Sequence, residues 1–367
     1  MPSAKKQTAA FCLSWVLAVL FVVSVSTLAI AQYQRVDLVS DQTGLARNTD
    51  PNLRNGWGLA FFPNGPFWVA DNTTGLSTLY DHSGNTLPLV VTVPVAPTNP
   101  FLGPIGSPTG LVTNPTSGFV VSANSHSGPA LFLFDTEDGT ISGWNPNVDA
   151  TNAIVAVDNS ASFAVYTGLA IATIDDDTFI YAADTFNNKI DVFDSRFKPV
   201  TLRPNAFVDT TVPAGMTAYN IQNIHGKLYV TYAVPFFTGQ SFQGGVVDVF
   251  TADGKLLKRL TRNGPTGPLQ APWGLVIAPE DFGPASNKLL VGNLDDGHIS
   301  VFNPRTGAFL GQLKDRNGNT IAIDGLWALV FGAGSAANGK RNELFYTAGP
   351  NFYADGLFGV ILSPEED

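Results

Sequence analysis

The residues Trp57–Asp71, WGLAFFPNGPFWVAD, contain the pattern from which the fold can be predicted. The stretch contains a short apolar run that opens on Trp-Gly, a turn at Pro63-Asn64-Gly65-Pro66 and a second apolar run that ends in Asp71. Short apolar runs bounded by Gly, Pro and Asn are typical of strands joined by tight turns. The stretch therefore predicts two neighbouring strands of an up-and-down sheet.

The opening phrase of this stretch recurs five more times along the chain. Its second residues stand at positions 58, 110, 168, 220, 274 and 328, so the steps between them are 52, 58, 52, 54 and 54 residues. The six copies begin at Trp57, Thr109, Thr167, Tyr219, Trp273 and Trp327. A near-constant period of this length indicates that the chain consists of copies of one supersecondary unit.

Each unit is expected to hold four strands. Second strands are expected at 67–71, 119–124, 179–184, 227–232, 289–293 and 344–348, and third strands include 130–135, 189–194, 245–250 and 298–303. Six such units predict an all-β fold, a six-bladed β-propeller. The last unit stops after 358–362, whereas 33–39 precedes the first unit. We therefore expect the N-terminal strand to complete the last blade and to cover its open edge.

The repeated phrase is expected to form the innermost strand of each blade. Its glycine is expected to permit the close approach of six backbones around the axis. We expect Trp57, Trp273 and Trp327 to act as packing wedges there, with a role as ligand platforms as the alternative.

Residues 1–31 have the features of a secretory signal peptide. Lys5 and Lys6 precede an uncharged stretch, and Ala29-Ile30-Ala31 matches a cleavage site, so the propeller domain is expected at 32–367. An uncleaved membrane anchor is the alternative. The chain's single cysteine, Cys12, lies inside this segment, so the mature protein is expected to have no disulfide or thiolate site. We expect a protein exported by a bacterium, either to the periplasm or to the medium.

The charge balance excludes some classes of partner. The chain has a formal net charge of −10, and without Lys5 and Lys6 it has 18 basic residues against 30 acidic ones. No cluster of Lys and Arg is available to neutralise phosphates, so nucleic acid and, after signal cleavage, membrane surfaces are not expected as partners. A small molecule, a glycan or a protein is expected instead, bound by a monomer.

The units resemble NHL repeats, whose blades carry a Gly-hydrophobic phrase, then Val-Ala-Asp, then a Val-Phe-Asp strand. The segments 69–72 (VADN) and 181–194 (YAADTFNNKIDVFD) are similar to this pattern. The stretches 33–60 and 324–332 also resemble an uncharacterised family of exported bacterial proteins, some of which end in a PEP-CTERM sorting signal. The chain ends in Pro364-Glu365-Glu366-Asp367 without such a signal, so the resemblance implies fold and export but not that sorting route.

The ends of the second strands are the candidate functional rim, because loops of successive blades converge at one end of a propeller axis. Ligand or metal candidates at this rim are Asp71, Asn72, Asn124, Asp184, Asn187, Tyr232, Asn293 and Asp295. Carboxylate and amide oxygens of this kind are ligands suited to Ca²⁺. The alternative is that these side chains cap their own turns.

Catalytic signals in the sequence are few. His126 is the only histidine expected at the rim and is a weak candidate for a general base. No G-x-S-x-G or H-E-x-x-H pattern is present. Six-bladed calcium-dependent lactonases and phosphotriesterases are similar in architecture, but no Glu begins an inner strand here. We therefore expect a binding or interaction module, with a calcium-assisted hydrolase or lyase acting at the channel mouth as the alternative.

Two insertions, 95–107 and 235–245, are longer than hairpin turns need. The second carries Phe236, Phe237 and Phe242, which are expected either to cover the channel mouth or meet a partner, or to pack against the neighbouring blade.

Overall fold

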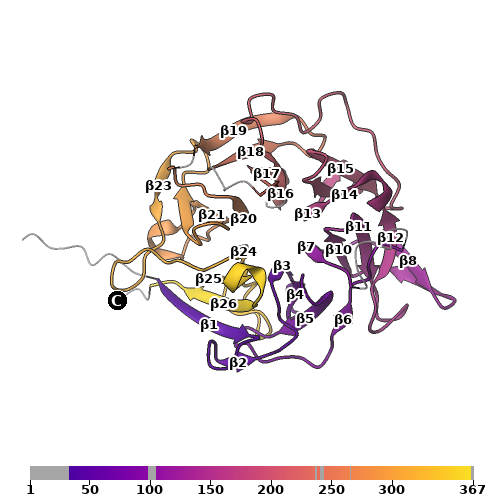
Figure 1. Ribbon diagram of the computed structural model, residues 1–367, viewed down its shortest axis with the longest axis horizontal. Helices are drawn as coiled ribbons and strands as arrows, with labels where there is room; N and C mark the ends of the chain where they lie inside the picture. Colours follow the sequence, from indigo (N-terminus) through magenta and orange to yellow (C-terminus); the bar gives the residue numbers. More distant parts are fainter. Residues whose placement is uncertain (1–32, 98–104, 236–237, 240–243, 265, 365–367) are drawn as a thin grey trace, which may run out of the picture. The chain divides into compact units, whose positions relative to one another are not determined.

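The computed structural model describes residues 33–97, 105–235, 238–239, 244–264 and 266–364. The expected signal peptide lies outside the described residues, as do Phe236, Phe237 and Phe242. The described chain forms a six-bladed β-propeller, as the repeat period predicts (Figure 1).

Blades 1, 4 and 5 have the expected four antiparallel strands in chain order from the axis outward. Blade 1 consists of β3 (Gly56–Ala60), β4 (Phe67–Asp71), β5 (Leu76–Tyr80) and β6 (Val91–Thr92). Blade 4 consists of β16 (Thr217–Ile224), β17 (Lys227–Ala233), β18 (Gly245–Phe250) and β19 (Leu256–Asn263). Blade 5 consists of β20 (Pro272–Ile277), β21 (Leu289–Asn293), β22 (Ile299–Phe302) and β23 (Phe309–Gln312).

Blade 6 is closed by the N-terminal strand, which confirms the expected ring closure. Its strands are β24 (Leu326–Phe331), β25 (Glu343–Ala348), β26 (Leu357–Leu362), β1 (Gln34–Ser40) and the short β2 (Asn48–Thr49). Strand β1 pairs antiparallel with β26, with Val36 opposite Val360 (Figure 1). Because β1 covers the outer edge of β26, the first and last strands of the ring hold each other in place.

Blade 3 has three named strands where four were expected: β13 (Tyr166–Ile174), β14 (Asp177–Asp184) and β15 (Lys189–Asp194). The place of a fourth strand is marked only by a single bridge between Phe193 and Pro199. The described helices are short: two 3₁₀ turns at Ser160–Ser162 and Gly283–Ala285, and α1 (Pro350–Tyr353). No helix in the described ranges is long and apolar enough to cross a bilayer.

The strand order expected for blade 2 is wrong. Its strands are β7 (Pro108–Thr113), β10 (Phe132–Thr136), β11 (Thr140–Trp144) and β12 (Ile154–Asp158). The run expected as the second strand, 119–124, instead forms a separate hairpin of β8 (Val120–Ala123) and β9 (His126–Pro129), which Figure 1 shows at the periphery. The run expected as the third strand, 130–135, largely coincides with β10, the second.

The hairpin forms because its turn residues suit it. Asn124 and Ser125 both have positive φ, 52° and 67°, the arrangement of a type I′ turn, which matches the twist of two paired strands. Behind it, Phe119 is fully buried and donates its backbone N–H to Ser195 of blade 3. The chain therefore leaves the blade at Phe119 and returns at Ala130, whose N–H is bonded to the Phe119 carbonyl.

The innermost strands β3, β7, β13, β16, β20 and β24 each contact the next, and β24 contacts β3, so the ring is closed (Figure 1). The glycines of the repeated phrase have the expected role. A Cβ on Gly58 would lie 2.3 Å from the Thr109 carbonyl oxygen, and one on Gly110 would lie 2.3 Å from the Leu169 nitrogen. These distances are shorter than any normal contact, so neighbouring backbones meet where a side chain is absent.

Candidate functional site

An aromatic plug fills the axis of the ring. It consists of the first residues of four repeated phrases: Trp57, Tyr219, Trp273 and Trp327, all at most 4% exposed. The Trp57 and Trp327 rings are stacked with centroids 3.6 Å apart, and Trp273 meets both edge-on at 6.3 and 5.9 Å. The packing role expected for the three tryptophans is thus confirmed, and a cavity lies at each end of the plug.

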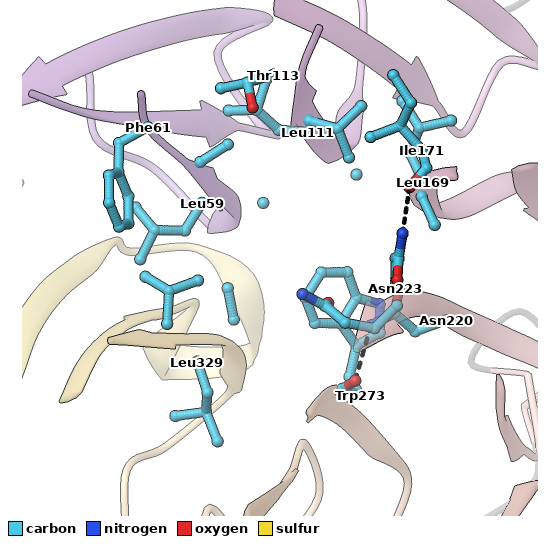
Figure 2. A pocket seen from close by; sticks show the side chains of 18 residues that line it. Leu59, Phe61, Leu111, Thr113, Leu169, Ile171, Asn220, Asn223, Trp273 and Leu329 are labelled. Atoms are coloured by element: carbon cyan, nitrogen blue, oxygen red, sulfur yellow. Dashed lines mark hydrogen bonds between the residues drawn. The ribbon is translucent and has the colours of Figure 1, made fainter. Parts of the chain in front are cut away.

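The first cavity, the leucine mouth, has a volume of about 290 Å³. Figure 2 shows its wall, which takes Leu59, Leu111, Leu169 and Leu329 from four inner strands. Blade 4 contributes amides: Asn220 donates to the Trp273 carbonyl at 2.8 Å and Asn223 to the Ile171 carbonyl at 2.8 Å. Asn220 occupies the glycine position of its phrase, and its side chain links blade 4 to blade 5.

The second cavity, the tryptophan mouth, lies at the opposite end, where the inner strands begin and the second strands end. It has a volume of about 190 Å³. Aromatic and polar side chains line it together: Asn55, Trp57, Asn72, Thr73, Glu137, Trp327 and Tyr353. The rim expected from the sequence belongs to this end of the axis, but only Asn72 of the expected residues lines the cavity.

A chain of hydrogen bonds connects the plug to a carboxylate across the tryptophan mouth. Trp327 Nε1 donates to Asn55 Oδ1 at 2.8 Å, Asn55 Nδ2 donates to Asn72 Oδ1 at 3.0 Å, and Asn72 Nδ2 donates to Glu137 Oε2 at 2.9 Å. An indole nitrogen can only donate, which fixes the orientation of both amides. The chain therefore ends with Glu137 as acceptor.

Glu137 is held in a poorly solvated place. Its pKa is raised by burial and by the neighbouring charge of Asp138, while the bond from Asn72 opposes the shift. Among the described residues no Lys, Arg or His lies within ion-pair distance of Glu137. The carboxylate thus faces the cavity with an amide partner but no positive charge to balance it.

Tyr353 is placed by a strained turn between β25 and β26. Asn351, Phe352 and Tyr353 all have positive φ (57°, 54° and 65°), which costs about 1–2 kcal/mol for each non-glycine residue. The turn is held by bonds from the Asn351 N–H to Asp324 and from the Tyr353 N–H to the Gly349 carbonyl. It sets the Tyr353 ring 5.7 Å from Trp327 and leaves Phe352 94% exposed. Such strain is common at binding sites.

Three of the expected rim residues are buried in separate blades. Asp71 is fully buried in blade 1, where burial raises its pKa well above the usual value, an interaction with Thr78 opposes the shift and the charge of Asp50 adds to it. In blade 5, Asn293 donates to the Pro268 carbonyl at 2.9 Å. In blade 4, Tyr232 is buried near Asp248.

Two further expected residues, Asp184 and Asn187, are hydrogen-bonded to each other. Asp184 accepts from the Asn187 side chain at 2.8 Å and from its backbone at 3.1 Å, the turn-capping arrangement that was the alternative. Asp295 is exposed, and its pKa is raised by partial burial and by Asp296.

Asn124 and His126 do not lie at the end of a second blade strand, because they belong to the inserted hairpin. Both are exposed, and His126 Nδ1 lies 3.0 Å from the Asn124 carbonyl oxygen. No group of three or more His, Cys, Asp or Glu side chains suited to a metal ion occurs among the described residues.

Glu137 was not among the expected site residues, because 130–135 was expected to be a third strand and Glu137 follows it in a turn. The available signal was the match of Phe134-Asp135-Thr136 to Ala183-Asp184-Thr185 and Ala70-Asp71-Asn72, which aligns β10 with the other second strands. In that alignment Glu137 follows the end of a second strand, at the rim.

Comparison with known proteins gives relatives and fold neighbours. No family model matches the chain. Two uncharacterized proteins of Acanthamoeba polyphaga mimivirus are similar over most of their length: R648, 34% identical over 89% of this chain and 80% of its own, and L690, 31% identical over 92% and 87%.

Among solved structures, virginiamycin B lyase from Staphylococcus aureus superposes with a TM-score of 0.51 at 11% identity, covering 90% of this chain and 99% of its own. A glucose dehydrogenase gives 0.51 at 12% identity, covering 89% and 98%. At such identities the likeness shows the propeller fold alone.

Proposed function

This chain belongs to the family of the mimivirus proteins R648 and L690, and we propose that its propeller is a binding module that takes a small ligand at the tryptophan mouth. The observation that carries the proposal is the convergence of three aromatic residues with the Asn55–Asn72–Glu137 chain around one cavity of about 190 Å³. Apolar walls with a few fixed polar groups are the usual composition of small-molecule sites.

The positions of these groups in the chain support a role in binding. Asn55 and Trp57 come from blade 1, Glu137 from blade 2, and Trp327 and Tyr353 from blade 6. Side chains from three blades that meet at one end of the axis give a rigid site, because each is anchored to a different sheet. The strained turn at Tyr353 adds a wall that packing alone does not require.

The test is a ligand screen by thermal shift and calorimetry, with neutral sugars, amino acids, organic amines and carboxylates. We expect at least one class to raise the melting temperature of the wild type and to lose about tenfold or more in affinity in Tyr353→Ala. Asn223→Ala, which alters the leucine mouth, is the matched control and should bind as the wild type does. Equal loss in both variants, or binding unaffected by Tyr353→Ala, would place the ligand elsewhere.

We also propose that the protein acts after export. The basic start, the uncharged stretch and the Ala-Ile-Ala site within residues 5–31 support this proposal. N-terminal sequencing of protein secreted by a suitable host should give Gln32 as the first residue, and an intact Met1 on secreted or membrane-bound protein would contradict cleavage.

A further inference from the structure

We propose that the tryptophan mouth recognises an organic cation, an alkylammonium group. This inference rests on the binding function proposed above and adds the chemical class of the ligand.

The charges around the mouth favour a positive guest. Glu137 faces the cavity, and Asp295 and Asp324 lie close enough to Tyr353 for their charges to act on its phenol. Arg54, the basic residue that directly precedes Asn55 in the chain, has other partners. Its guanidinium donates to the Ala354 carbonyl at 2.7 and 3.0 Å and lies 3.8 Å from Asp41. A ligand cation would supply the missing counter-charge at short range.

The aromatic residues supply the second half of cation recognition. Trp57, Trp327 and Tyr353 all line the mouth, and Tyr353 lies beside Trp327 at a ring separation of 5.7 Å. The face of a phenol ring attracts ammonium groups, so Tyr353 can supply this contact, whereas Trp57 and Trp327 are stacked on each other at 3.6 Å and are at most 2% exposed. An alkylammonium group can contact such rings without the ordered water shell of a metal ion.

Other ligand classes fit less well. An anion would require a basic side chain, and no Lys, Arg or His lines the mouth. A neutral sugar could contact the aromatic rings and the amides, but it would leave Glu137 without a counter-charge. Burial already raises the pKa of Glu137 and so disfavours its ionised form. The acidic surroundings therefore favour the cation over the sugar.

The experiment compares choline with its neutral isostere 3,3-dimethylbutan-1-ol by isothermal titration and by tryptophan fluorescence. We expect choline to bind at least tenfold more tightly than the isostere, and Glu137→Gln to remove that preference. Glu280→Gln takes the same charge from an exposed loop after β20 and should behave as the wild type does. Thermal melting of both variants checks that the fold is intact.

A pH series separates a charge contact from a packing effect. Choline affinity should rise with pH as Glu137 ionises above its ordinary range; the facing titratable groups are Asp138 beside it and the phenol of Tyr219 from β16. Equal affinity for choline and the isostere, or an unchanged preference in Glu137→Gln, would overturn the cation proposal.

The outcomes also distinguish the two proposals. If neutral sugars bind the wild type but not Tyr353→Ala, and choline does not bind, the binding function stands and the cation proposal is wrong. If no class of probe responds to substitutions in the tryptophan mouth, both proposals fail.

Discussion

Asp135 at the end of β10 is fully buried, and its Oδ1 accepts hydrogen bonds from Thr109 Oγ1 at 2.8 Å and from the Gly110 N–H. Burial raises its pKa to about 7, while the bonds from Thr109 and Gly110 oppose the shift. Between its ordinary pKa of 3.8 and about 7, the folded state therefore holds a proton that the unfolded chain releases.

The contribution of Asp135 to the free energy of unfolding should consequently fall as pH rises from about 4 to about 7, by up to about 1.4 kcal/mol per pH unit. Above about pH 7 this contribution should stay constant. Asp135→Asn, which keeps the acceptor oxygen, should remove this part of the slope. Urea unfolding across this pH range measures it, with exposed Asp176→Asn as control. A variant slope equal to the wild type's would show that Asp135 does not hold the proton.

Gly58 tests the close approach of blades 1 and 2. A Cβ there would lie 2.3 Å from a backbone oxygen and 3.0 Å from the Leu111 nitrogen, neither of which can move without shifting β7. Gly58→Ala should lower the free energy of unfolding by about 1–3 kcal/mol. Gly264→Ala, with no atom within 4 Å of the new Cβ, is the control and should stay within about 1 kcal/mol of the wild type.

At the scale of elements, the β8–β9 hairpin is an insertion that the blade does not need. Residues 122–127 form its tip beyond the Val121–Gly128 pair, and these tip residues contribute nothing to the buried apolar core except the half-buried Ala123. Val121 itself is buried in the core of blades 2 and 3 and should be kept.

Replacing 122–127 by Asn-Gly would rejoin the hairpin two pairs earlier, directly after the Val121–Gly128 pair, with a favoured turn. We expect the melting temperature to change by no more than about 3 °C, since all the lost residues are exposed except the half-buried Ala123. Ligand binding at the tryptophan mouth should persist although Asn124 and His126 are gone. Loss of binding with an intact fold would restore these two residues as site candidates.

At the scale of the whole molecule, ring closure depends on β1. Leu38 and Val39 are at most 1% exposed and belong to the core shared with blades 1 and 6, and Tyr33 donates its hydroxyl hydrogen to the Phe282 carbonyl of blade 5. Deleting 33–40 removes these contacts and uncovers the β26 edge. The truncated chain should aggregate or elute as oligomers in size-exclusion chromatography; a monomer with wild-type melting would refute the closure argument.

The calcium alternative makes a whole-molecule prediction as well. A tightly held ion raises the melting temperature through its binding free energy, by several degrees at saturating concentration. Asp71, Asp184 and Asn293 lie in three separate blades, and no group of three or more acidic, His or Cys side chains suited to a metal ion occurs among the described residues, so we expect calcium and a chelator to leave the melting temperature within about 1 °C. A marked rise with calcium would favour the metal-assisted enzyme.

The number of blades and the strand that closes the ring could both be predicted from the amino-acid sequence, because both follow from counting repeats. Six phrases at a near-constant step indicate six copies of one unit. The strand expected before the first unit can supply the strand that the last unit lacks. The longest step, 58 residues between Gly110 and Gly168, even marks the unit that carries the inserted hairpin.

The residues that meet at the axis could be identified only from the folded chain. An inserted hairpin has the same alternation of apolar residues as a blade strand, so a local pattern cannot tell β8 from β10. The Asn55–Asn72–Glu137 chain joins residues up to 82 positions apart, and its geometry depends on how three blades and their loops are oriented around the plug. Repetition specifies the unit, whereas the site arises where the units differ and face one another.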